Sequence, residues 1–167
     1  MKSLSVHIAL VEPEIPQNTG NIARTCAATG SGLHLVGKLG FSVEDRYLKR
    51  AGLDYWDKVL VSRCSKIDEL KEKYGDYTFY FASTKAGHTY TDVVYPEKCF
   101  LVFGKETAGL PEELLEANRE TCIRIPMLPG IRSLNLSNSV AIVLYEVLRQ
   151  RGFNNMELKG KMGMEDV

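Results

Sequence analysis

Short runs of consecutive hydrophobic residues recur along the chain, separated by polar stretches that contain glycine. Runs of four or five apolar residues bounded in this way are typical of β-strands buried on both faces. Such runs predict strands at residues 6–10, 33–36, 79–82, 100–103 and 122–125, with a weaker candidate at 59–61. Because helical patterns lie between the runs, the chain is predicted to form an α/β domain on a largely parallel sheet.

Helical spacing separates these runs. Thr19 is predicted to cap a helix over residues 20–28, and residues 67–74 combine apolar spacing with charge. Pro111 suits the first turn of a short helix, because the N–H that proline lacks would have no helical partner there. The broadest apolar stripe, at steps of three and four, predicts a last helix over residues 136–151.

Composition predicts one small domain. A chain of 167 residues with 44% hydrophobic residues can bury an ordinary core, and we expect the domain over residues 1–158 with a polar tail at 159–167. Lys+Arg and Asp+Glu both number 21, so an RNA-binding surface would require local clustering of charge.

The chain shows no pattern typical of secreted, membrane or metal-binding proteins. Its four cysteines are far apart with no Cys-x-x-Cys pair, so we expect reduced, mostly buried thiols and no metal. No segment resembles a secretory signal or a membrane span, and a cytoplasmic location is expected.

Three segments combine glycine, proline and asparagine beside the predicted strands. They are the first loop (residues 12–30), the second loop (101–115) and the third loop (124–142). In an open parallel sheet, ligands bind beyond the carboxyl ends of the strands. We therefore expect the functional site where these loops meet.

The side chains in these loops also have plainer interpretations. An arginine such as Arg24 in the first loop usually lies on the surface or forms an ion pair. A glutamate such as Glu106 in the second loop is usually a solvated turn residue. Ser133 and Asn135 in the third loop are typical helix caps, and alone that role is favoured over catalysis. Gly104 lets a ligand approach the backbone, or simply ends a strand. The histidines, His7, His34 and His88, are expected to be satisfied or exposed polar residues.

A basic segment follows the second predicted strand. Arg46, Lys49 and Arg50 recur at helical spacing, and three aromatic residues lie close by: Tyr47, Tyr55 and Trp56. Such a face can hold phosphates while aromatic rings stack on bases, and a plain solvated helix face explains it equally well.

Taken together, the three loops resemble the motifs of the SPOUT class of RNA methyltransferases. The match is close to the tRNA (cytidine/uridine-34-2′-O)-methyltransferase family and extends from the first strand through the last helix. It is carried by EPEIPQNTGNIARTCAATG, RAGLDYW, VFGKETAGLP and RIPMLPGIRSLNLSNSVAIVLYE, in the order and spacing of that family.

The resemblance implies a parallel-sheet α/β fold with helices on both faces and a deep C-terminal trefoil knot. It also implies a homodimer, a tRNA anticodon-loop substrate and the cofactor S-adenosylmethionine, which becomes S-adenosylhomocysteine. The implied cofactor-binding residues are Ala82, Ser83, Thr84, Gly104, Ile125, Met127, Ser133 and Leu134. The implied catalytic residues are Arg24, Glu106, Ser133 and Asn135, and the expected substrate-binding residues are Asn18, Arg24, Arg46, Lys49 and Arg50.

Arg24 is the implied activating residue, and physical chemistry limits its role. A guanidinium would cost about 8 kcal/mol to deprotonate at neutral pH. Our hypothesis is therefore that Arg24 stays cationic, grips the adjacent phosphate and stabilises the developing alkoxide, while the proton goes to phosphate or water.

Three alternative functions are weighed against this one. The first is 2′-O-methylation at another tRNA or rRNA site, and the second is a non-catalytic RNA-binding protein with the same fold. The third, a dinucleotide-dependent oxidoreductase, is disfavoured because Gly30 and Gly32 precede a strand instead of following one.

Overall fold

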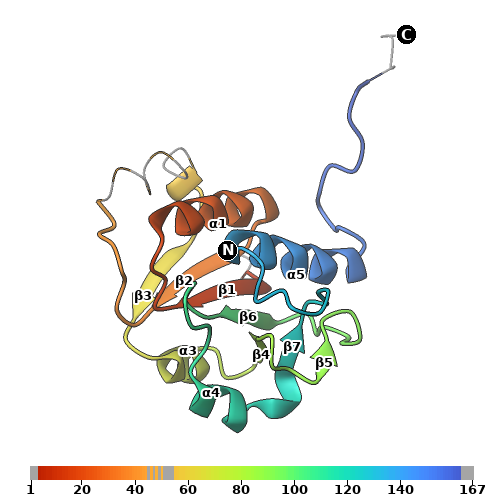
Figure 1. Cartoon of the computed structure of the whole chain (residues 1–167). Helices are drawn as coiled ribbons and strands as arrows, with labels where there is room; N and C mark the ends of the chain where they lie inside the picture. Colours follow the sequence, from red (N-terminus) through yellow and green to blue (C-terminus); the bar gives the residue numbers. More distant parts are fainter. Residues whose placement is uncertain (1–3, 45, 47, 49, 51–54, 163–167) are drawn as a thin grey trace.

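The computed structural model describes residues 4–44, 46, 48, 50 and 55–162. Within these residues, seven strands form one parallel sheet in the order β3-β2-β1-β6-β4-β7-β5 (Figure 1). The strands are β1 Val6–Val11, β2 Gly32–Val36, β3 Val61–Cys64, β4 Thr78–Ala82, β5 His88–Thr89, β6 Cys99–Phe103 and β7 Cys122–Arg124. The helices are α1 Pro16–Thr29, α3 Ile67–Lys73, α4 Glu112–Ala117 and α5 Leu136–Gln150, with a 3-10 turn at Arg119–Thr121.

Helices cover both faces of the sheet, which confirms the predicted fold class. The α1 and α5 helices lie side by side on one face, and apolar residues of both pack on alternate residues of the central strands. The other face packs against α3 through Ile67 and Leu70, and against α4 and the loop before it through Leu114 and Leu110. The central strands are buried, except for Val11 at the end of β1, because both of their faces are covered, and this explains their largely apolar sequences.

The predicted strands and helices are confirmed with two differences in the sheet. The weak candidate at residues 59–61 is displaced, because β3 begins only at Val61. This strand lies at the edge of the sheet and has three half-buried residues and one exposed residue, so its apolar signal is weak. The two-residue strand β5 is too short to produce a pattern.

The prediction that Thr19 caps the first helix is wrong. Helix α1 begins at Pro16, one turn earlier, and Thr19 is fully buried inside the helix with a hydroxyl that has no hydrogen-bond partner among the described residues. Proline fixes a helical φ and suits the first turn, so it starts the helix here. The residue before the helix, Ile15, provides no side-chain hydrogen bond that caps α1. A carboxylate that is distant in the sequence contacts this end instead, as described below.

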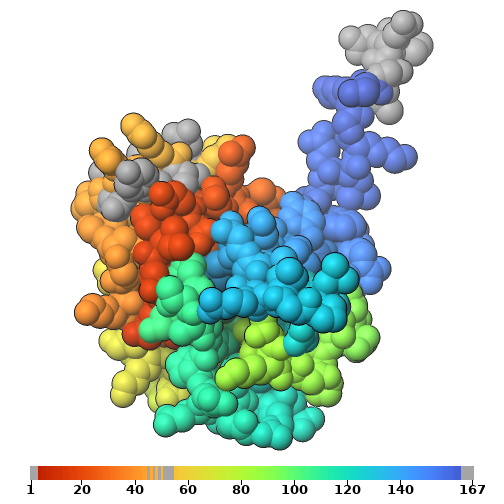
Figure 2. Space-filling model, viewed as in Figure 1, coloured from red at the N-terminus to blue at the C-terminus, as the bar shows by residue number. Residues whose placement is uncertain are grey.

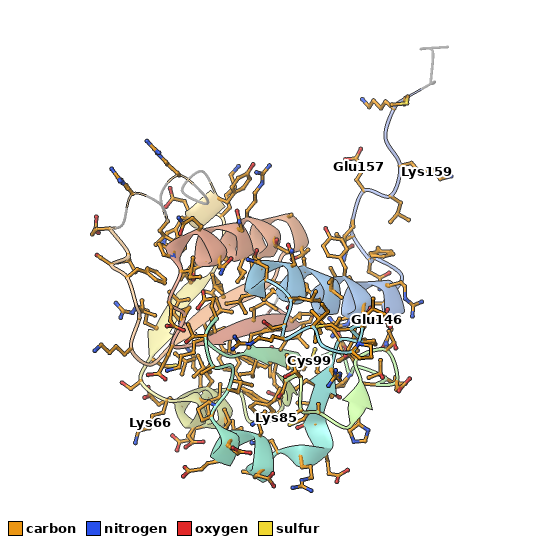
Figure 3. The ribbon with its side chains drawn as sticks, in the orientation of Figure 1. Lys66, Lys85, Cys99, Glu146, Glu157 and Lys159 are labelled. Carbon is orange, nitrogen blue, oxygen red and sulfur yellow. The ribbon has the colours of Figure 1, made fainter. Side chains whose placement is uncertain are left out.

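The chain after α5 leaves the body of the domain. Figures 1 and 2 show the segment that carries Glu157 and Lys159, both labelled in Figure 3, projecting away from the helices. No helix in the described part of the chain is long and apolar enough to cross a membrane.

Candidate functional site

A pocket of about 530 Å³ lies at the carboxyl ends of β4, β6 and β7. All three loops predicted from the sequence contribute to its walls. The lining includes every residue expected to contact the cofactor, namely Ala82, Ser83, Thr84, Gly104, Ile125, Met127, Ser133 and Leu134. Asn18, Glu106 and Asn135 also line it. The structure therefore brings together residues that are more than one hundred positions apart in the sequence.

A chain of hydrogen bonds joins one side chain from each loop. The Asn135 Nδ2 donates to Asn18 Oδ1 over 3.1 Å, and Asn18 Nδ2 donates to Glu106 Oε1 over 3.2 Å. We call this chain the Asn135–Asn18–Glu106 relay. Figure 2 shows the three segments, red, green and cyan, meeting on one face of the molecule. The relay fixes the mutual position of the three loops around the pocket.

Glu106 organises the start of α1. Besides Asn18, its carboxylate accepts the backbone N–H of Glu14 over 2.8 Å and that of Ile15 over 3.0 Å. A carboxylate at this end of a helix also interacts favourably with the helix dipole. Glu106 thus contacts the end of α1 that lacks a side-chain cap, and the plain interpretation of Glu106 as a solvated turn residue is wrong.

A second contact joins the first two loops in the opposite direction. The Glu14 carboxylate accepts hydrogen bonds from the Thr107 hydroxyl over 2.6 Å and from the Thr107 N–H over 3.2 Å. Both hydrogen bonds lower the pKa of Glu14 below its ordinary value, and the bond from the hydroxyl has the larger effect. The sequence carries no signal for this pair, because nothing local links residues 93 positions apart.

Asn135 both caps α5 and belongs to the relay. Its Oδ1 accepts the N–H of Ser137 over 2.9 Å and that of Asn138 over 3.3 Å. Its Nδ2 remains available and reaches Asn18. The capping interpretation is therefore confirmed for Asn135, and the same side chain lines the pocket. Ser133 is exposed at the rim of the pocket.

The second loop folds back tightly on itself after β6. A Cβ built on Gly104 would lie 2.0 Å from the carbonyl carbon of Gly109 and 2.2 Å from the nitrogen of Leu110. Gly109 has a φ of 68° and donates its N–H to Lys105. Glycine is thus required at position 104 because the chain approaches itself there, while the same residue lines the pocket.

Three cationic residues that the sequence analysis did not select also line the pocket: Lys85, Lys105 and Arg132. Lys85, labelled in Figure 3, lies 3.5 Å from Glu112 of α4, and Lys105 lies 3.8 Å from Glu12. Arg132 is exposed and forms no ion pair with any residue that the structure describes. The only sequence signal for Arg132 was its place beside Ser133.

Arg24 does not line this pocket. It is exposed on α1, and its guanidinium carbon lies 5.1 Å from the centre of the Tyr55 ring, in a cation–π contact. Tyr55 is half-buried and Trp56 packs partly against the core, which leaves Trp56 a structural role. Arg46 and Arg50 are exposed but do not line the pocket, and Lys49 and Tyr47 lie outside the described residues.

The remaining polar predictions are confirmed. His7 and His34 are buried and hydrogen-bonded to each other, while His88 is exposed. All four cysteines are free, and three of them are buried. Burial raises the pKa of the Cys26 thiol to about 12 and that of Cys99 to about 11, so both thiols are protonated at neutral pH.

Comparison with known protein families gives one match over most of the chain. A family model described as the SpoU rRNA Methylase family matches residues 5–145. A protein of Listeria innocua named "Putative tRNA (cytidine(34)-2'-O)-methyltransferase" is 57% identical over 150 residues, covering 88% of this chain and 89% of that protein. The tRNA (cytidine(34)-2′-O)-methyltransferase of Escherichia coli is 43% identical over 155 residues, covering 92% and 99%.

Solved structures share the fold. One, described as giving structural insights into the 2-OH methylation of C/U34 on tRNA, aligns with a TM-score of 0.83 at 39% identity, covering 89% of this chain and 97% of that one. An AdoMet-bound rRNA methyltransferase from Sinorhizobium meliloti aligns with a TM-score of 0.78 at 26% identity, covering 87% of this chain and 56% of that one.

Proposed function

Because the chain belongs to the SpoU rRNA methylase family, we propose that it transfers a methyl group from S-adenosylmethionine to the ribose 2′-hydroxyl of nucleotide 34 in tRNA. Relatives covering most of the chain carry this activity in their names, which favours position 34 over another RNA site and over a non-catalytic role. The structural observation that carries the proposal is the convergence of three distant loops on one pocket through the Asn135–Asn18–Glu106 relay.

The pocket suits the cofactor in size and chemistry. A volume of about 530 Å³ lies within the usual range for small-molecule sites. Apolar side chains of Ile125, Met127 and Leu134 offer contacts for adenine, and the polar residues Ser83, Thr84 and Ser133 lie near them. When bound, S-adenosylmethionine supplies an electrophilic methyl group. The protein's task is then to align the ribose oxygen with that group and to handle the hydroxyl proton.

In this proposal the relay residues hold the loops in place. Both oxygens of Glu106 are engaged by donors of the first loop, so we assign Glu106 a positioning role and not that of the proton acceptor. Asn135 likewise fixes the start of α5 against the first loop.

Arg24 has a different role in the proposal. It remains cationic, binds a phosphate beside the target ribose and stabilises the developing alkoxide, and the proton leaves to phosphate or water. Since Arg24 lies outside its own pocket, it would act on the pocket of a partner protomer. A homodimer built on the α1–α5 side is supported by two half-exposed apolar residues of α5, Ile142 and Tyr145.

The activity is tested by incubating purified protein with bulk tRNA and labelled S-adenosylmethionine, followed by nucleoside mass spectrometry. We expect 2′-O-methylated nucleotide 34 with wild type, and loss of label with Arg24→Ala or Asn135→Ala. Arg119→Ala, on the exposed 3-10 turn before β7, is the matched control and should retain activity. Absence of label at nucleotide 34 in the wild-type reaction contradicts the proposal.

The shared site is tested by mixing two inactive variants. If Arg24 acts on the partner's pocket, mixed dimers of Arg24→Ala and Asn135→Ala contain one intact site, and random exchange restores about a quarter of wild-type activity. If both residues act on the same pocket, mixing restores nothing. Sedimentation of the wild type checks the dimer itself. From the tRNA substrate we also infer that the protein works in the cytoplasm.

The trefoil knot implied by the sequence resemblance stays a prediction. So does the division into a domain over residues 1–158 and a tail over 159–167.

A further inference from the structure

A second hollow, of about 410 Å³, lies at the carboxyl ends of β2 and β3. It is lined by Gly37, Lys38, Arg63, Cys64 and Ser65, and we call it the β2–β3 hollow. In Figure 1 the chain leaves these two strands at the left-hand edge of the sheet. Nothing in the sequence singled out this place, because its two cations stand 25 positions apart and in no motif.

The β2–β3 hollow and the proposed methylation pocket both lie at the carboxyl ends of the parallel strands. In the strand register, Cys64 pairs with Val36, Val36 pairs with Val11, and Leu10 pairs with Phe103. Gly37 and Gly104, which follow the ends of β2 and β6, therefore lie within one residue of the same level in the sheet. Only β1 separates β2 from β6, so the nearest strands of the two sites are about 10 Å apart.

The two cations of the hollow are available for a ligand. Lys38 and Arg63 are exposed, and neither forms an ion pair with a residue that the structure describes. The acids nearby have other partners. Glu12, which lies between the two sites, is 3.8 Å from Lys105, and Glu69 accepts the N–H groups of Ser65 and Lys66.

Backbone donors of the hollow are also in use. Gly37 donates its N–H to Cys64 over 2.9 Å, and the Ser65 N–H goes to Glu69. A ligand would therefore meet two positive side chains and few free backbone groups. A wide, open site of this kind suits a phosphodiester, which is singly charged and remains partly hydrated, better than a small anion that must be enclosed.

We propose that Lys38 and Arg63 form a binding site for the RNA backbone, which holds a phosphodiester next to the nucleotide whose ribose occupies the methylation pocket. This inference rests on the proposed function and extends the RNA-binding surface to the β3 edge, beyond Arg24, Arg46, Lys49 and Arg50. The two side chains position the substrate and do not touch the reacting atoms.

The test is a double substitution, Lys38→Gln with Arg63→Gln. The matched control is Lys73→Gln with Arg119→Gln, which removes the same charge. These two residues lie at the amino ends of the strands, where α3 ends before β4 and where β7 begins. Binding of tRNA is measured against salt concentration, and methyl transfer gives kcat and KM. Calorimetric titration with S-adenosylhomocysteine shows whether each variant keeps a folded cofactor pocket.

The expected result is a loss of RNA binding without a loss of chemistry. Removing two phosphate contacts lowers the slope of log Kd against log salt by about 1.5, which is roughly tenfold in Kd near 0.15 M salt. We expect KM for tRNA to rise by a similar factor, with kcat and the affinity for S-adenosylhomocysteine unchanged. The control variant should keep the wild-type slope.

Three outcomes would overturn the inference while leaving methylation at nucleotide 34 intact. The first is a salt slope equal to that of the control, and the second is a loss of kcat in place of a rise in KM. The third is saturable binding of inorganic phosphate that the double substitution removes, which would identify a small-anion site. Failure of the proposed function is recognised separately, because the wild type itself would then methylate no tRNA.

Discussion

The buried histidine pair predicts that the protein loses stability in mildly acidic solution. His7 and His34 are 2% and 1% exposed, and His7 Nδ1 lies 2.8 Å from His34 Nε2. His7 Nε2 is hydrogen-bonded to the carbonyl oxygen of Leu4. Because a carbonyl oxygen can only accept a hydrogen bond, His7 Nε2 must carry the proton. His7 Nδ1 then accepts from His34 Nε2, and His34 Nδ1 accepts from the Ser62 hydroxyl. This order requires both rings to be neutral.

Burial lowers the pKa of both rings, and burial together with the nearby His7 and Lys73 lowers that of His34 to about 3. In the unfolded chain both rings have a pKa near 6.5 and take up protons below it. Stability is therefore fully present above pH 6.5 and is lost as the pH falls. Between pH 7.5 and pH 5.0 the loss is about 2 kcal/mol for His34, and the lowered pKa of His7 adds a loss of the same sign.

Urea unfolding at fixed protein concentration, followed by the fluorescence of the single tryptophan Trp56, measures this effect. The carboxylates whose pKa the fold lowers, Glu14, Asp76 and Glu146, contribute only at lower pH, because their ordinary values are 4.5 or less. His88→Gln is the control, since that ring is exposed, and it should show the wild-type pH dependence. A free energy of unfolding that stays constant from pH 7.5 to 5.0, or rises, would refute the argument.

Three further predictions concern the loops around the pocket. Glu106→Gln removes the charged acceptor of the first loop, and we expect at least roughly tenfold weaker S-adenosylhomocysteine binding by calorimetry, because one charged hydrogen bond contributes about 1.5 kcal/mol or more; unchanged affinity would show that the contact does not order the pocket. Gly104→Ala places a Cβ inside the second loop and should cost about 3 kcal/mol or more in urea unfolding, whereas Gly87→Ala, with open space around it, should cost little; equal costs would contradict the steric argument. Arg24→Lys should reduce kcat by about tenfold or more with unchanged tRNA affinity, since lysine lacks the forked guanidinium, and retention of most turnover would refute the need for that fork.

Local sequence information predicted those parts of the fold whose causes are local. Strands β1, β2, β4 and β6 are covered on both faces, so each appears as a largely apolar run, which His7 interrupts in β1 and His34 in β2. The α5 helix has a regular apolar stripe and a capping asparagine, Asn135, directly before its first residue. Thr19 was misassigned because the start of α1 depends on Pro16 and on Glu106, which lies 91 positions away from the N–H of Ile15.

For the candidate site, the sequence by itself identified the residues expected to contact the cofactor, all of which line the pocket, since their types and order match a family pattern carried by three continuous segments. Only the tertiary structure decided how they act together. It joined Asn135, Asn18 and Glu106 by hydrogen bonds, left Arg24 outside its own pocket, and brought Lys38 beside Arg63. The physical reason is range: apolar patterns and caps are set by neighbouring residues, whereas hydrogen bonds and charge clusters depend on how parallel strands align their ends at one edge of the sheet.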